Sequence, residues 1–174
     1  MTTPVLAERP MAVDDAGTLD RGGAKLEFGW SKDHKERGWE GAAGYAPIDN
    51  LELELGFARA IDHDTDPNTR LRGYGFAAKW VPLQSETGLS AGLKFEYGRT
   101  RSKDRINPGE TEHARALLGL ASWRFASGQI IHVNLGREWV KVDGPDDSAN
   151  TWGIGFEQPL SENLQLTLET YGAD

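Results

Sequence analysis

Hydrophobic and polar residues alternate along most of the chain, from residue 23 to residue 171. In NLELELGFARA, residues 50–60, four apolar side chains fall on one side of an extended backbone, while Glu52 and Glu54 fall on the other. A period of two residues is typical of a β-strand with two unlike faces. The pattern therefore predicts strands, and one segment alone does not say which face meets water.

Segments with this alternation recur along the chain, and turn residues separate them. They cover residues 23–31, 39–46, 50–60, 70–81, 89–99, 113–125, 129–140, 151–158 and 164–172. The sequence therefore predicts an all-β protein, an antiparallel up-and-down meander of about nine or ten strands.

The links between these segments tend to alternate in length. Shorter links lie at 47–50, 82–88, 126–128 and 159–163, and longer polar links lie at 32–38, 62–69, 100–112 and 141–150. In a meander, alternate links lie at opposite ends of the sheet. Short turns at one end and longer loops at the other are typical of a transmembrane, outer-membrane-type β-barrel.

Two interpretations of the apolar face remain open at this point: the core of a soluble sandwich, or a lipid-facing surface. Aromatic residues gather near the segment ends, where Trp and Tyr would lie at a membrane interface. They are Trp30, Trp80, Tyr97, Trp123, Phe125, Trp139 and Trp152. Because the middle positions are mainly aliphatic, the barrel is favoured, with its charged face lining the lumen.

The charged face supplies the candidate functional residues. The lumen-lining candidates are Lys25, Glu27, Glu52, Glu54, Lys79, Lys94, Glu96 and Glu138. Rings of charged side chains select ions in pores, but small barrels fill their interiors with side chains. A selective lining and a set of paired charges that holds the barrel's shape therefore both remain open.

Composition narrows the function. The 174 residues suffice for one domain, and 19 Lys and Arg against 27 Asp and Glu give a formal net charge of −8, unlike the basic face of a nucleic-acid-binding protein. The mean hydropathy is −0.55, and no apolar run approaches the roughly 20 residues of a transmembrane helix. The chain has no cysteine, which excludes disulfides and thiolate metal sites.

No arrangement of nucleophile, base and orienting group stands out in the sequence, so we expect no enzyme activity, cofactor or dedicated metal site. One link carries three closely spaced carboxylates, Asp62, Asp64 and Asp66, which could bind a cation weakly. A solvated turn is the favoured interpretation. His34 and His63 would form a transition-metal site only if their loops met.

Several phrases of the sequence carry a resemblance: ERPMAVDDAGTL, KLEFGW, LELELGFARA, GFAAKWVPL, GLASWRF, HVNLGREW and TWGIGFEQPLSENLQLTLETYG. From about residue 9 onward the chain resembles proteobacterial outer-membrane proteins of the MetA-pathway family, the transporters assigned to phenol degradation. The resemblance implies a lipid-embedded barrel of about a dozen strands in a Gram-negative outer membrane. It also implies a channel or transport role for small solutes, including hydrophobic or aromatic compounds.

We predict an N-terminal segment at residues 1–22, extended or lumenal, and a barrel domain at 23–174. Residues 5–19 would either add a tenth strand or tuck into the lumen. MTTPVLAERP lacks the features of a secretory signal, and the end at YGAD after nine strands suggests a fragment without its final strands.

The expected partners are outer-membrane lipid and a small solute, with no nucleic acid. Two alternatives stay open: a structural or loop-binding barrel with a filled lumen, and a soluble β-barrel that binds a small apolar ligand.

Overall fold

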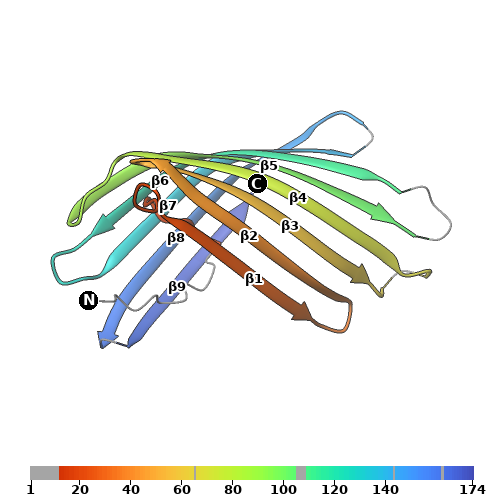
Figure 1. Ribbon diagram of the computed structural model, residues 1–174, viewed down its shortest axis with the longest axis horizontal. Helices are drawn as coiled ribbons and strands as arrows, with labels where there is room; N and C mark the ends of the chain where they lie inside the picture. Colours follow the sequence, from red (N-terminus) through yellow and green to blue (C-terminus); the bar gives the residue numbers. More distant parts are fainter. Residues whose placement is uncertain (1–11, 65, 105–108, 143, 162) are drawn as a thin grey trace.

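The computed structural model describes residues 12–64, 66–104, 109–142, 144–161 and 163–174. Within these ranges nine strands form one antiparallel sheet in chain order, which confirms the all-β meander (Figure 1). The strands are β1 (Ala24–Lys32), β2 (Glu36–Ile48), β3 (Leu51–Asp62), β4 (Thr69–Leu83), β5 (Gly88–Lys103), β6 (Thr111–Arg124), β7 (Ile130–Val142), β8 (Asp147–Ser161) and β9 (Leu164–Ala173).

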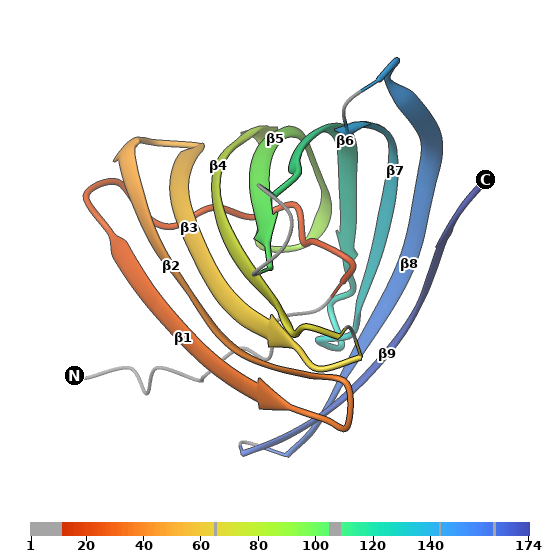
Figure 2. The same cartoon turned by 90° about the vertical axis from the view of Figure 1, so that its right-hand side faces the viewer.

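The sheet curls into a half-barrel with a convex and a concave face (Figure 2). Each strand pairs with its neighbours in sequence, and among the described residues β1 and β9 do not pair with each other. No helix in the described part of the chain is long and apolar enough to span a membrane.

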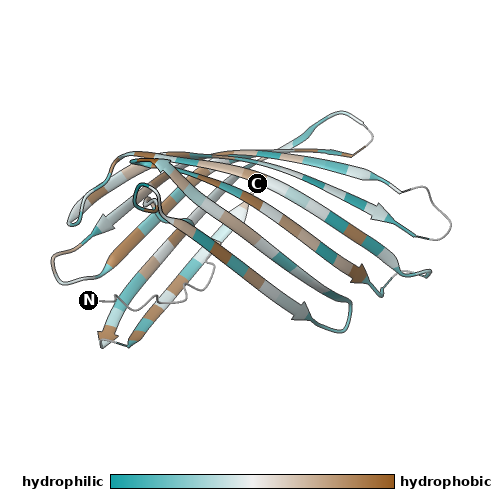
Figure 3. Cartoon of the chain, viewed as in Figure 1, coloured by the Kyte–Doolittle hydropathy of each residue, from teal (hydrophilic) through white to brown (hydrophobic). Residues whose placement is uncertain are grey.

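The convex face carries the large apolar side chains, and they are exposed. Leu26 is 81% exposed, and Leu55 and Leu135 are each 64% exposed. Along each strand these positions alternate with more polar ones, which appear as alternating brown and teal bands in Figure 3. The largest apolar surface of the sheet is therefore on its outside.

The concave face carries buried polar side chains, the reverse of an ordinary soluble core. Glu52 is 6% exposed and Asn134 is 4% exposed. Within the described residues, the cluster of buried apolar side chains is small and consists of Ala16, Val81 and Leu120. Polar contacts, rather than apolar packing, therefore dominate the inside of the curled sheet.

Most strands extend further than the sequence pattern predicts, and the links between them are correspondingly shorter. β5 continues to Lys103 instead of ending near residue 99, and only 33–35 separate β1 from β2, where the longer link 32–38 was predicted. The reason is that polar residues beyond the apolar run keep the alternation and find ladder partners, such as Lys32 opposite Arg37 and Arg70 opposite Lys103.

The meander places the links β1–β2, β3–β4, β5–β6 and β7–β8 at one end of the sheet, on the right of Figure 1. We call this the long-link end, after the sequence prediction. The links β2–β3, β4–β5, β6–β7 and β8–β9 lie at the opposite, short-link end.

Candidate functional site

Residues 12–23, which we call the inner segment, cross the concave face of the sheet without pairing as a strand (Figure 2). At one side Val13 N donates to Glu169 Oε2 of β9 at 3.2 Å, and at the other Leu19 N donates to Glu52 Oε2 of β3 at 3.0 Å. The segment therefore links strands from opposite halves of the sheet. Of the predicted segment 5–19, residues 5–11 lie outside the described residues.

The centre of this site is a carboxylate held between two lysines. Lys79 of β4 and Lys94 of β5 are directly opposite each other in the ladder. Asp14 accepts from Lys79 Nζ at 2.9 Å through Oδ1, and from Lys94 Nζ through Oδ2. Asp15 adds a second contact to Lys79 at 2.9 Å. Like charges directly opposite each other destabilise a strand pair, so Asp14 offsets the repulsion between the two lysines.

Two effects act in opposite directions on the pKa of Asp14. Burial raises it, whereas the charges and hydrogen bonds of Lys79 and Lys94 lower it, and the lysines prevail, so the pKa of Asp14 lies below its ordinary value. The ionised carboxylate is therefore the form that the site stabilises.

The backbone of the inner segment is held at the same point. Asp14 N donates to Asn134 Oδ1 at 2.6 Å, and Asn134 Nδ2 donates to the carbonyl oxygen of Asp14 at 2.9 Å. Val13 next to it is 2% exposed and packs against Gly153, where a Cβ atom would lie 2.8 Å from Val13 Cγ2. The absence of a side chain at Gly153 thus leaves the room that Val13 fills.

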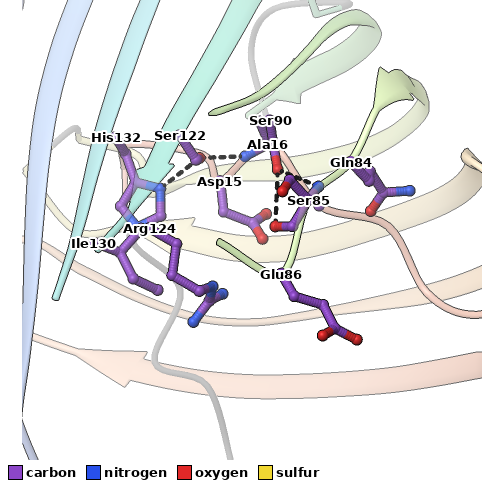
Figure 4. A pocket seen from close by; sticks show the side chains of 11 residues that line it. Asp15, Ala16, Gln84, Ser85, Glu86, Ser90, Ser122, Arg124, Ile130 and His132 are labelled. Atoms are coloured by element: carbon purple, nitrogen blue, oxygen red, sulfur yellow. Dashed lines mark hydrogen bonds between the residues drawn. The ribbon is translucent and has the colours of Figure 1, made fainter. Parts of the chain in front are cut away.

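A second polar group joins the inner segment to β6 and β7. Ala16 N donates to Ser122 Oγ at 2.7 Å, and Ser122 Oγ lies 2.8 Å from His132 Nδ1 (Figure 4). His132 Nε2 lies 3.4 Å from Glu157 Oε1, but the geometry of that contact does not satisfy a hydrogen bond. Because Ala16 N–H occupies the serine oxygen, the group is suited to anchoring the segment.

A hollow opens beside this anchor at the short-link end. Figure 4 shows Asp15, Gln84, Ser85 and Arg124 around it, together with Ser122 and His132. Its rim thus brings together side chains of the inner segment, the β4–β5 link, β6 and β7. The lining mixes polar and apolar groups and carries both signs of charge, which suits water or a small polar solute.

The ladder register places all eight lumen-lining candidates on the concave set of positions. Lys25 joins Glu52 and Glu54 at 2.9 Å each, and Lys94 joins Glu96 at 2.8 Å. Glu27 lies 3.8 Å from Lys25. Lys79 pairs with the inner segment as described above. Glu138 has no ion pair among the described residues. Their role as the lining of a pore stays a prediction.

Sequence reasoning missed the residues that complete the site: Asp14, Asp15, Ser122, His132 and Asn134. A signal for Asp14 was present, because the strand ranges bring two concave lysines, Lys79 and Lys94, onto neighbouring strands. Such a pair requires an anion, and the adjacent Asp14 and Asp15 precede the first strand. Nothing in the alternation pattern distinguishes Ser122, His132 or Asn134 from ordinary polar positions.

The two loop candidates for cation binding, against which a solvated loop was the favoured interpretation, gain no support. The loops of His34 and His63 do meet, since His63 N donates to the Lys35 carbonyl oxygen at 2.7 Å. However, the described residues contain no group of three or more His, Asp or Glu side chains that could hold a metal ion. Lys35 pairs with Asp64 at 3.3 Å, so that one of the three loop aspartates has a side-chain partner.

Comparison with known proteins places the chain in a family. A family model described as "Uncharacterised conserved protein UCP029691" matches residues 2–174. The chain belongs to this family. Neither a curated protein nor a solved structure matches it. The family match covers the inner segment as well as the nine strands, and it does not link the chain to the phenol-degradation transporters, so that resemblance stays a prediction.

Proposed function

We propose that this chain forms the wall of an outer-membrane β-barrel in a Gram-negative bacterium, with its convex face in lipid. The observation that carries the proposal is the inverted exposure: large apolar side chains cover the outside of the sheet, and polar and charged side chains lie inside. In water such a surface would favour aggregation, whereas in a bilayer it is the stable arrangement.

The length of the apolar surface fits this proposal. On β5, alternate positions from Leu89 to Tyr97 are apolar and lie on the convex face, and these nine residues match the roughly 9–11 of a tilted membrane-spanning strand. Aromatic residues occur at its short-link margin, where Trp80 is 52% and Trp123 is 48% exposed. Such positions suit the bilayer interface.

We further propose that the concave face borders a passage for small solutes, and that the inner segment narrows it. The charges on that face support a wet interior, because Lys25, Glu52 and Glu54 form ion pairs there. The segment's attachment to β3, β4, β5, β6, β7 and β9 supports the competing candidate, a filled barrel with a structural role. Both candidates share the membrane location and differ in whether solutes pass.

The membrane proposal is tested by contact with lipid. Because the chain has no cysteine, a fluorophore can be attached to single cysteines at Leu55 and Leu135 on the convex face, and at Glu27 and Glu138 on the concave face. After refolding into phosphatidylcholine vesicles, quenchers on the lipid chains should dim the dyes at Leu55 and Leu135 and spare the other two. Equal quenching on both faces, or a folded protein without detergent or lipid, would refute the proposal.

Passage of solutes is tested by conductance in a planar bilayer. The native protein should show cation-selective conductance that weakens at high salt, since the concave acids outnumber the concave lysines. Removal of residues 1–19 should raise the conductance by freeing the passage. If neither protein conducts while both insert, the filled barrel is correct.

A further inference from the structure

Charged residues of the nine strands are sorted by face. The ladder register puts every strand aspartate and glutamate on the concave set of positions. Four lysines and arginines share that face: Lys25, Lys79, Lys94 and Arg124. All other strand lysines and arginines fall on the convex set. An acidic protein thus has a convex surface whose strand charges are all positive.

These convex cations form what we call the basic belt. Its members are Lys32, Arg37, Arg59, Arg70, Arg72, Arg99, Arg101, Lys103, Arg115, Arg137 and Lys141. All lie in the half of the strands next to the long-link end. On β5 the convex positions read Leu93, Phe95, Tyr97, Arg99 and Arg101 in order. On this strand the belt therefore follows directly on the apolar surface, beyond the aromatic Tyr97.

Within the belt, cations face cations. Arg59 of β3 is directly opposite Arg72 of β4, and Arg72 is directly opposite Arg101 of β5. One step nearer the links, Arg70 is opposite Lys103. Such ladders of like charge are unfavourable unless an anion lies between them. Arg59, Arg70 and Arg72 have no ion pair among the described residues, whereas Arg115, further along the belt, pairs with Asp146 at 2.6 Å.

The centre of the belt is shaped as well as charged. Five belt cations line a hollow on the sheet together with Ile61 and two loop carboxylates, so that cations outnumber acids there: Arg37, Arg70, Arg72, Arg101 and Lys103 against Asp66 and Asp104. Guanidinium groups bind phosphate oxygens in a forked, bidentate manner. An apolar side chain at the same place suits a ligand that joins an anionic group to a hydrocarbon part.

We propose that the basic belt binds the phosphate-bearing headgroups of anionic lipids in the leaflet at the long-link end. This inference rests on the proposed membrane location, because the belt then lies at the height of the headgroups. Two observations favour a lipid over a soluble anion: the belt borders the apolar surface directly, and it continues across β1 to β7 instead of forming one closed pocket. Cations at the membrane surface attract anionic lipids in this way.

The proposal is tested by lipid selectivity at the protein surface. The full chain is folded into phosphatidylcholine bilayers that contain a trace of spin-labelled phosphatidylglycerol or spin-labelled phosphatidylcholine, and the immobilised lipid is measured by electron spin resonance. We expect about fivefold stronger association of the phosphatidylglycerol at low salt, falling toward equality near 1 M salt.

The test variant replaces three belt arginines with glutamine, R59Q/R70Q/R72Q, and should lose most of this selectivity. The matched control is Arg124→Gln, which removes the same kind of charge from the concave face at the short-link end and should keep it. Equal selectivity in the triple variant and the wild type would overturn the proposal. So would loss of selectivity on adding inorganic phosphate at constant ionic strength, because that assigns the belt to soluble anions.

The two proposals fail in distinguishable ways. If no spin-labelled lipid is immobilised and the protein does not enter phosphatidylcholine bilayers, the membrane location is wrong. If both lipids are immobilised to the same extent by an inserted wild-type protein, the location stands and the basic belt does not bind phosphate headgroups. Insertion of the triple variant into pure phosphatidylcholine shows that it folds.

Discussion

Two pairs of opposed cations on the same sheet have different surroundings. On the concave face Lys79 and Lys94 are bridged by Asp14 from the inner segment. On the convex face Arg59 and Arg72 are equally close in register and have no carboxylate partner among the described residues. For these two pairs, the protein supplies the counter-ion on the concave face and leaves the cations to their surroundings on the convex face.

This difference indicates what each face meets. A buried pair of lysines needs a fixed counter-ion, because water cannot solvate it fully. An exposed arginine keeps its charge on any surface, yet it stabilises the protein more where the surroundings supply phosphate or carboxylate groups. The Lys79–Lys94 pair thus has its counter-ion within the protein, whereas the Arg59–Arg72 pair is suited to an external one.

The largest expected effect comes from adding a cation to the apolar surface, outside the basic belt. Leu55→Arg puts a charge in the middle of the apolar surface and should make folding into a bilayer less favourable by about 2–4 kcal/mol. The neighbouring Glu54→Gln on the concave face should change the same free energy by less than about 1 kcal/mol, because Lys25 keeps its ion pair with Glu52. Denaturant titrations in vesicles measure both, and equal losses would remove the distinction between the faces.

Removing the internal counter-ion should have a smaller but clear effect. Asp14→Asn leaves Lys79 and Lys94 opposite each other and should destabilise the folded protein by about 2 kcal/mol. Asp15→Asn is the control, because Asp15 is more exposed and contacts Lys79 alone. Thermal or denaturant unfolding in detergent distinguishes them. If the control loses as much as Asp14→Asn, the bridging role of Asp14 is wrong.

Acid should release the inner segment. The lysines hold the pKa of Asp14 below its ordinary value, so the ionised carboxylate stabilises the attached state. This contribution is complete above the ordinary aspartate pKa of about 4 and is lost as the pH falls through the lower folded value. The anisotropy of a dye on Asp20→Cys should therefore fall below about pH 4. In an Asp14→Asn background that step should be absent, and a step that persists there comes from another group.

The smallest effect concerns the serine anchor. Ser122→Ala removes the acceptor of the Ala16 N–H and the partner of His132, and should cost about 1 kcal/mol. Ser31→Ala, at an exposed concave position of β1, should change stability by less than about 0.5 kcal/mol. Unfolding curves of the two variants give the comparison, and a silent Ser122→Ala would reduce the anchor to an incidental contact.

The strands themselves could be predicted from sequence, because alternation over eight or more residues is a strong local signal. Their ends could not, since the prediction assigned polar stretches to links. RTRSK at 99–103 shows why: Arg99, Arg101 and Lys103 alternate with Thr100 and Ser102, so the strand pattern continues in cations instead of apolar residues. Applying the period of two to charge as well as to hydrophobicity would have extended β5.

The basic belt was overlooked for the same reason. Arg137 was an isolated exception on the apolar side of its segment when strands were considered one at a time. Its meaning depends on the register of neighbouring strands, which places Arg115 and Lys141 near it on the same face. Register depends on link geometry and is not visible within a single segment.

The bridge at Asp14 also has a consequence for the order of assembly. While the chain folds, pairing β4 with β5 brings Lys79 and Lys94 together. Their repulsion destabilises the hairpin until a carboxylate lies between them. The carboxylate comes from a residue that precedes both lysines by more than sixty positions, and Asn134 of β7 holds the backbone of the same residue. The sheet should therefore curl fully only after the N-terminal part of the chain has docked. Asp14 thus couples the final curvature to the correct placement of β4, β5 and β7.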